Sequence, residues 1–256
     1  MVTGGSDERL ALLEQRVTQL EEENHRLQRV KDAQEIQNVF SLHEYYHQAA
    51  RHAEEMDALW ARKQPDLAME EAVLNGRYVG PEAVRAYYVD FFKSFDKANL
   101  AEVRRLYPQA PVAPDATLPF GVQLLHTLTT PVIEVAEDRD TAKAVWISPG
   151  VVTAPTGGKL QAFWHWDRYA IDFIREDAKW KIWHFWVGKD FSTPYHRSWV
   201  EDFFEAPGIS LENVPGFPKP NAPSMTTYHG YSPYEPAKFI PRPPEPYRTF
   251  SETFSY

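Results

Sequence analysis

The sequence of 256 residues contains no cysteine, and this absence removes several classes of chemistry. Without cysteine there can be no disulfide, no thiolate nucleophile and no cysteine-ligated metal cluster. A cytoplasmic location, which we expect, is compatible with this composition, although the composition alone does not require it.

Basic residues and long apolar runs are also scarce. The 27 Lys and Arg residues face 36 Asp and Glu residues, so the net charge is −9 and nucleic acid is not an expected partner. No apolar run approaches the ~20 residues that cross a bilayer, and the start, MVTGGSDE, lacks the pattern of a signal peptide. We therefore expect no membrane partner. Phosphate-binding glycine loops and the G-x-S-x-G motif are missing too, so no cofactor is expected.

Aromatic residues are abundant, and five of the eight tryptophans lie in residues 160–191. Two aromatic-rich runs, 160–174 and 179–191, flank the polar turn 175–178, a pattern that predicts a β-hairpin. Buried polar groups cost about 1–3 kcal/mol each if unpaired, so polar residues inside such strands indicate a lined small-molecule cavity. The polar residues within the two runs include His165, Asp167, Arg168, His184 and Lys189. Strand alternation would turn Lys189 and Trp183 inward and His184 outward.

The N-terminal part carries a heptad pattern over residues 7–30, after a segment, 1–6, that we expect to be disordered. A coiled coil would make the chain a homodimer or a higher homo-oligomer, and one buried Asn favours two strands in register. The alternative is an amphipathic helix packed on its own domain. The seam positions are Leu10, Leu13, Val17, Leu20, Asn24 and Leu27.

The following residues, 31–198, predict one α+β domain in which a curved antiparallel sheet wraps helices. Helical spacing continues to Ala50, and the other expected elements are helices at 53–63 and 82–95, a strand–turn–strand at 68–79, and strands at 121–128, 131–136 and 141–148. Eleven of the 21 prolines lie after residue 205, together with several tyrosines. Residues 199–256 are therefore predicted to form an extended arm over this domain or a neighbour's; a disordered tail is the alternative.

One short motif, His43-Glu44-Tyr45-Tyr46-His47, matches the H-E-x-x-H pattern of zinc proteases. The glycine and third histidine of the longer metalloprotease motif are missing, and two ligands alone do not make a metal site. Three interpretations stay open: a metal site that uses His43 and His47, two histidines on a half-buried helix face, or acid/base groups at a cavity mouth.

Several short segments together resemble the SnoaL-like branch of the NTF2-like superfamily, over about residues 30–191. They are Asp57-Ala58-Leu59-Trp60, Gly80-Pro81-Glu82, Thr129-Thr130-Pro131-Val132-Ile133, and Asp167-Arg168-Tyr169 followed by Lys179-Trp180-Lys181-Ile182. The resemblance implies a cone of three helices against a strongly bent antiparallel sheet, with the active site inside. Similar proteins include bile acid dehydratases, scytalone dehydratase and γ-formaldehyde lyases of lignin-derived diaryl compounds.

The resemblance also implies site residues. The family's tyrosine on the first helix falls near Tyr46, with His43 or His47 as rivals, and the histidine before the Thr-Pro pair matches His126. The basic residue at the end of the last strand matches Lys189. The family's mid-sheet aspartate falls within 145–149, where no carboxylate stands. Asp167 is expected either to supply this missing carboxylate or to pair with Arg168.

From these residues we expect a cofactor-independent lyase that acts on a small hydroxylated aromatic substrate and releases water or formaldehyde. The expected catalytic residues are Tyr46, His47, His126 and Lys189, and the expected substrate-binding residues are His43, Trp60, Tyr88, Trp146, Trp164, His165, Asp167, Arg168, Trp183 and Phe185. The alternatives are a non-catalytic ligand-binding or assembly module and a metal-dependent enzyme that uses His43 and His47.

Overall fold

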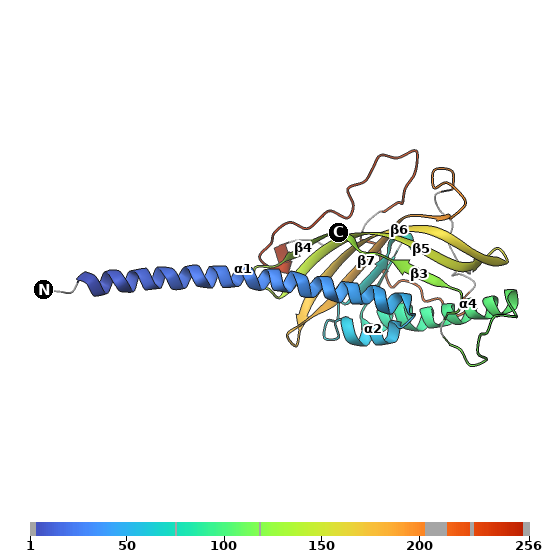
Figure 1. The fold of residues 1–256 in the computed structure, drawn as a ribbon, viewed down its shortest axis with the longest axis horizontal. Coiled ribbons are helices and arrows are strands. Elements are labelled where there is room, and N and C mark those ends of the chain that lie inside the picture. The colour runs from blue at the N-terminus through green and yellow to red at the C-terminus, as the bar shows by residue number, and fades with distance from the viewer. Residues whose placement is uncertain (1–3, 75, 118, 203–213, 226–227, 253–256) are drawn as a thin grey trace.

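The computed structural model describes residues 4–74, 76–117, 119–202, 214–225 and 228–252. Its first element, α1 (Gly4–Gln48), is one unbroken helix of 45 residues, whose N-terminal part extends well beyond the rest of the molecule (Figure 1). Residues 4–6, expected to be disordered, belong to this helix, and residues 1–3 lie outside the described part. The five leucine and valine residues of the predicted seam are each 51–61% exposed, so this face does not pack on its own domain. Within the described residues, none of the helices is sufficiently long and apolar to cross a bilayer.

The sheet contains every predicted strand and confirms the α+β class. Its order is β3-β5-β6-β7-β1-β2-β8, and β4 also pairs with β5. The pairs are antiparallel except β1 with β7. The strands are β1 (Ala68–Glu71), β2 (Gly76–Val79), β3 (Gln123–His126), β4 (Thr129–Val135), β5 (Thr141–Thr156), β6 (Lys159–Glu176), β7 (Lys179–Pro194) and β8 (Ala222–Pro223).

The predicted hairpin is β6 and β7, joined at Asp177 and Ala178, which both have positive φ. Strand β5 is longer than the expected 141–148, because it continues through Pro149 and Gly150, residues that usually interrupt strands. It then turns at Gly157 and Gly158, whose φ values of 59° and 78° are easily reached by glycine.

The helices lie on one face of the sheet. Besides α1, they are α2 (His52–Leu59) and a longer helix composed of α3 (Pro81–Arg85), the π-helical turn η2 (Ala86–Phe91) and α4 (Phe92–Leu106). A short 3₁₀ turn, η1 (Ala72–Leu74), follows β1. The second half of α1, α2 and α4 all run beneath the strands in Figure 1. The face of the sheet toward these helices is called the inner face below.

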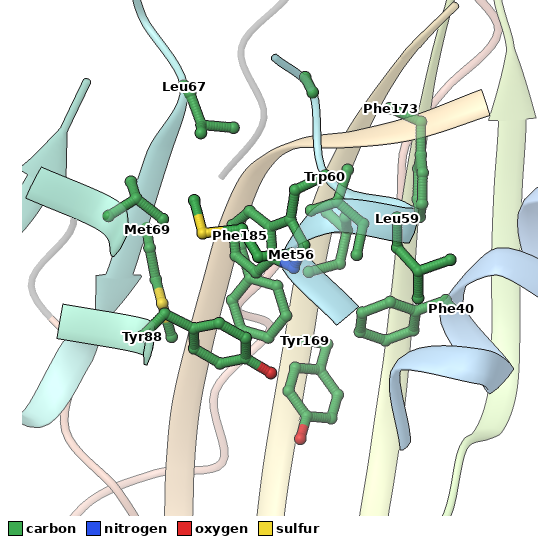
Figure 2. Close-up of a cluster of buried hydrophobic side chains, with 14 of the residues drawn as sticks. Phe40, Met56, Leu59, Trp60, Leu67, Met69, Tyr88, Tyr169, Phe173 and Phe185 are labelled. Atoms are coloured by element: carbon green, nitrogen blue, oxygen red, sulfur yellow. The ribbon is translucent and has the colours of Figure 1, made fainter. Parts of the chain in front are cut away.

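The hydrophobic core fills the space between this inner face and the helices. Phe40 from α1 packs on Trp146 with ring centroids 4.4 Å apart, and Trp60 stacks on Phe185 at 5.5 Å. Figure 2 shows the rings of Phe40, Trp60 and Phe185 beside Met56, Leu59 and Phe173, with the hydroxyls of Tyr88 and Tyr169 on the same side of the cluster. Aromatic residues of the inner face therefore close one part of the cone.

From Tyr228 on, the described part of the predicted C-terminal arm, residues 199–256, lies on the opposite face of the sheet, called the outer face. Earlier in the arm, Val214 and Phe217 pack in the hydrophobic core, with the Phe217 ring 5.0 Å from that of Phe91. Of its described parts, Tyr228 packs on Trp186 at 5.2 Å, and the Ile240 carbonyl accepts a hydrogen bond from Arg168 at 3.4 Å. Farther along, Phe250 of the short turn η4 (Phe250–Glu252) packs on Trp183 at 4.6 Å. The described parts of the arm thus cover their own domain; residues 203–213, 226–227 and 253–256 lie outside the described part.

Candidate functional site

A buried cluster on the inner face joins two strands of the sheet. Asp167 Oδ2 of β6 lies 3.1 Å from His165 Nε2 and 3.4 Å from His126 Nδ1 of β3. The three side chains are at most 8% exposed. His165 and Asp167 face the same way because alternate residues of a strand share a face. His126 lies 39 residues or more from both in sequence, so only the sheet brings the three together.

Gly150 permits this approach. It lies beside His126 on one side and His165 on the other in the strand register. A Cβ atom at this position would stand 2.5 Å from the Leu125 carbonyl oxygen and 3.2 Å from His126 Nδ1. Any side chain here would therefore push β3 away from β5, so the glycine determines how closely His126 approaches Asp167.

The electrostatics of the cluster favour a charged carboxylate beside a neutral imidazole. Burial alone would raise the pKa of Asp167, but the neighbouring His165, His126 and Lys189 hold this pKa well below its usual range. Burial lowers the pKa of His126 well below the usual value, and the Asp167 carboxylate only partly opposes it. At neutral pH His126 is therefore a neutral imidazole that can accept a proton next to a stabilising negative charge.

Helix α1 contributes two more titratable side chains. Burial raises the pKa of Glu44 to about 7, so a large share of this carboxyl carries a proton at neutral pH. Burial lowers the pKa of His47 to about 4, and its Nδ1 lies 3.0 Å from His52 Nε2 on α2. The His47 ring centroid is 5.6 Å from that of His126. The helix thus presents a neutral imidazole and a carboxylic acid to the strand cluster.

Several buried polar atoms around this cluster have no hydrogen-bond partner among the described residues. They are both carboxyl oxygens of Glu44, Ser148 Oγ, Asp167 Oδ1 and His126 Nδ1, the last of which faces Asp167 Oδ2 at 3.4 Å without forming a hydrogen bond. Ser148 lies directly beside Asp167 in the strand register, within the segment where the family's mid-sheet aspartate was expected. Asp167 therefore supplies a carboxylate next to that position. Such a concentration of unpartnered atoms is rare in a folded core and indicates a place for bound polar groups.

The expected catalytic residues Lys189 and Tyr46 have different places. Lys189 of β7 lies opposite Asp167 in the register, and its Nζ is 3.8 Å from Glu71 Oε1. Tyr46 is half-buried against the hydrophobic core, and its phenol forms no hydrogen bond with the described residues. Tyr169, which sequence reasoning did not select, lies near Glu44 and Asp167 instead, and burial followed by the charge of Glu44 raises its pKa well above the usual value.

The two histidines of the H-E-x-x-H motif have separate hydrogen-bond partners. His43 Nδ1 donates to Glu55 Oε1 at 2.7 Å, and the same carboxylate accepts from Trp60 Nε1 at 2.9 Å and from the Tyr88 hydroxyl at 2.7 Å. Burial would lower the pKa of His43, but the Glu55 charge raises it above the usual value. His43, Trp60 and Tyr88 thus hold Glu55 in place. Sequence reasoning did not identify Glu55, although a glutamate amid the apolar positions of a short helix was a usable signal.

Four of the expected aromatic walls, Trp60, Tyr88, Trp146 and Phe185, belong to the hydrophobic core and pack on one another or on Phe40. They form the closed end of the cone beside the polar cluster. The Trp146 indole donates to the Gln37 side chain of α1 at 3.1 Å.

Three other expected substrate-binding residues, Trp164, Arg168 and Trp183, lie on the outer face, away from the polar cluster. Trp164 stacks on Tyr195 at 5.7 Å, and Arg168 pairs with Asp190, not with Asp167. A bulge in β7 breaks the expected alternation, because Asp172 pairs with His184 and Phe173 with Ile182, which leaves Trp183 as the extra residue. Trp183 therefore packs on His184 and Phe250 of the outer face while Phe185 stays in the core.

A metal ion is chemically compatible with the strand cluster rather than with the helix pair. Ligand atoms of His126, His165 and Asp167 lie within 4.8 Å of one another. Among the described residues, these three side chains form the group whose spacing could hold a metal ion. Two imidazoles and a carboxylate are a usual donor set for zinc or iron.

The chain is similar to one sequence family and to several solved structures. The sequence model of a family described as a SnoaL-like domain matches residues 28–185. No curated protein matches the chain. A crystal structure of LinA is similar with 15% identity and a TM-score of 0.48, covering 72% of this chain and 99% of that one. A LinA-type3 hexachlorocyclohexane dehydrochlorinase from Novosphingobium barchaimii is 16% identical, with coverages of 70% and 99% and a TM-score of 0.45. A putative scytalone dehydratase from Novosphingobium aromaticivorans is 14% identical, with coverages of 68% and 93% and a TM-score of 0.44.

Proposed function

Because the chain belongs to the SnoaL-like family, we propose that it is a cofactor-independent lyase acting on a small hydroxylated aromatic compound, such as one derived from lignin. The observation that carries the proposal is the set of buried, unpartnered polar atoms around His126 and Asp167. A purely structural core leaves few such atoms, since each costs about 1–3 kcal/mol. A substrate with polar groups would pair with them, and the titratable ones would then move its protons.

His126 is the proposed base. Its imidazole is neutral, and the adjacent Asp167 carboxylate would stabilise the imidazolium that forms when it takes a proton. His165 holds Asp167 from the other side, and His165 Nδ1 in turn lies 3.3 Å from Ser192 Oγ. This arrangement of a carboxylate that orients an imidazole is the usual one for general-base catalysis.

Glu44 is the proposed acid. If water leaves, His126 takes the proton from carbon, the carbon–oxygen bond breaks, and Glu44 protonates the departing hydroxyl. If formaldehyde leaves, His126 takes the proton of a primary alcohol, the carbon–carbon bond breaks, and Glu44 protonates the carbon that remains. In both cases solvent returns the proton from His126 to Glu44. Lys189, which pairs with Asp167 in the strand register, is the proposed group that stabilises negative charge developing on the substrate.

The test uses His126→Ala with His196→Ala as the matched control, because His196 is exposed. Purified proteins are incubated with hydroxylated aromatic compounds, and dehydrated products and formaldehyde are both measured. A positioned base contributes roughly 10²–10⁴-fold, so His126→Ala should lose at least a hundredfold in kcat/KM while the control keeps full activity. Unchanged turnover by His126→Ala would refute the assignment.

The metal-dependent alternative is favoured by one observation, the spacing of His126, His165 and Asp167. Metal analysis of the purified protein separates the two proposals. About one equivalent of zinc or iron, together with loss of activity in a chelator, would replace the cofactor-independent mechanism by a metal-assisted one. Ligand binding with no turnover at all would instead favour a non-catalytic binding module.

We also propose that residues 7–30 pair with a second copy of the chain in a coiled coil. The seam leucines are exposed along the projecting part of α1, and such a row of apolar residues usually faces a partner helix. Leu13→Asp combined with Leu20→Asp should convert the homo-oligomer into a monomer in sedimentation experiments, while Glu14→Asp on the same helix should not. A monomeric unmodified protein would contradict this proposal.

A further inference from the structure

Two buried polar residues of α4, Asp96 and Asn99, take no part in the proposed chemistry. Asn99 is completely buried, and both atoms of its amide lack a hydrogen-bond partner among the described residues. Asp96, one turn earlier, is only 5% exposed and forms no hydrogen bond or ion pair with the described residues. An amide that is completely buried without a partner is costly, so a further group that pairs with it is expected.

The position of these residues connects them with the candidate site. Phe92, Asp96, Asn99 and Val103 recur at intervals of four, three and four, so they share one face of the helix. The Phe92 ring lies 4.8 Å from His52 and 6.1 Å from His47. Seven residues of helix, about 10 Å, separate Phe92 from Asn99. The shared face therefore leads from the histidines of the site along the inside of the cone.

The far end of this face lies next to the turn between β5 and β6. A Cβ atom built on Gly121 would stand 3.8 Å from the Val103 side chain and 3.2 Å from the Leu160 side chain, so Val103 lies near Leu160. The Tyr107 hydroxyl accepts a hydrogen bond from the Leu160 backbone at 3.2 Å. Asp96 and Asn99 thus lie between the histidines near Phe92 and the turn that joins β5 and β6.

From this placement we infer that Asp96 and Asn99 form a distal subsite that binds a neutral hydroxyl group of the substrate, about 10 Å along α4 from Phe92, which contacts His52 and His47. An amide has both a hydrogen-bond donor and an acceptor, and a hydroxyl group can form hydrogen bonds with both. The neighbouring carboxyl group disfavours a substrate carboxylate or phosphate, and Phe92 and Phe95 offer apolar surface for an aromatic ring beside it. Burial raises the pKa of Asp96 to about 7, which adds a neutral partner for the hydroxyl at lower pH.

The inference rests on the proposed function for the identity of the reacting end, so binding is measured separately from turnover. The probes are pairs of hydroxylated aromatic compounds about 10 Å long, each with either a hydroxyl or a methoxy group at the far end. Their dissociation constants are determined by calorimetry on His126→Ala, which removes the proposed base, and on the same protein with Asn99→Leu added. Lys97→Leu, on the exposed side of the same helix, replaces Asn99→Leu in the matched control.

The expected result is that the hydroxyl compound binds at least tenfold more tightly than its methyl ether, that Asn99→Leu abolishes this preference, and that Lys97→Leu preserves it. Without ligand, Asn99→Leu should raise the melting temperature, because leucine has a similar volume and leaves no polar atom unpaired. Asp96→Asn, which keeps the shape, should reduce the preference as well.

Three results would overturn the inference: an unchanged preference in both Asn99→Leu and Asp96→Asn, no preference in the starting protein, or a lowered melting temperature in Asn99→Leu, which would show a structural role. The two proposals fail differently. Preferential binding without any turnover would leave the subsite and remove the lyase, whereas turnover with no preference would leave the lyase and remove the subsite.

Discussion

Glu44 should make the stability of the protein depend on pH in a direction opposite to that of most carboxyl groups. Its side chain is 8% exposed, neither oxygen has a hydrogen-bond partner among the described residues, and burial raises its pKa from 4.5 to about 7. The folded state therefore holds this proton more tightly than the unfolded state does. Replacing Glu44 by glutamine, which stays neutral at every pH, should remove the effect.

The magnitude follows from the two pKa values. Below pH 4.5 both states carry the proton, and the stabilisation by the raised pKa is fully present. As the pH rises toward 7, the unfolded state loses the proton first, so the free energy of unfolding falls by about 1.4 kcal/mol per pH unit. The total loss is about 3 kcal/mol, most of it between pH 5 and pH 8.

The measurement is the free energy of unfolding in urea at pH 5, 6, 7 and 8, at one protein concentration. The unmodified protein should lose about 2.5 kcal/mol more than Glu44→Gln over this range. Glu21→Gln, at an exposed position of the same helix, is the control and should behave like the unmodified protein. Equal slopes for the unmodified protein and Glu44→Gln would show that Glu44 is already ionised in the folded state, and the proposed acid would be lost with it.

Three further predictions concern the cluster and the arm. Gly150→Ala should lower kcat/KM at least tenfold and cost about 1–3 kcal/mol of stability, because its Cβ would meet the Leu125 carbonyl oxygen. Gly158→Ala is the control: its Cβ would meet no atom within 4 Å, so although its φ of 78° makes alanine strained there, kcat/KM should stay unchanged in the same assay. Asp167→Asn should lower kcat by roughly 10²-fold or more and shift the pH–rate profile, whereas the control His196→Ala should leave the profile unchanged. Equal pH–rate profiles for Asp167→Asn and the unmodified protein would refute the role of Asp167. Gly188→Ala should release the arm, because its Cβ would lie 2.4 Å from Trp186 and 2.8 Å from Tyr228; faster proteolysis after residue 214 would reveal this, and an unchanged digestion pattern would contradict it.

Local sequence patterns were sufficient for most of the fold. The heptads predicted the first helix, and the aromatic runs on either side of residues 175–178 predicted the hairpin of β6 and β7, because side-chain periodicity is a property of neighbouring residues. The alternation of β6 is regular at His165 and Asp167, which therefore share one face. Local patterns failed at β5, where Pro149 and Gly150 lie within a strand whose partners on both sides sustain it.

The candidate site was only partly predictable. The position of His126 followed from family resemblance, but its pairing with Asp167 depends on the glycine that allows β3 to approach β5. Glu44 stood inside the H-E-x-x-H motif and was considered only as a metalloprotease base. Its role depends on burial, which the sequence does not state. Trp183 was misplaced because a bulge depends on how two strands align, and not on either strand alone.

The sequence by itself thus determined which segments are helix or strand, that no cysteine chemistry occurs, and that polar residues stand within aromatic strands. Only the tertiary structure decided which of these polar residues meet, because α1, β3 and β6 approach one another through packing between distant segments. It also decided the charge of each group, since pKa values depend on burial and on neighbours that are remote in the chain.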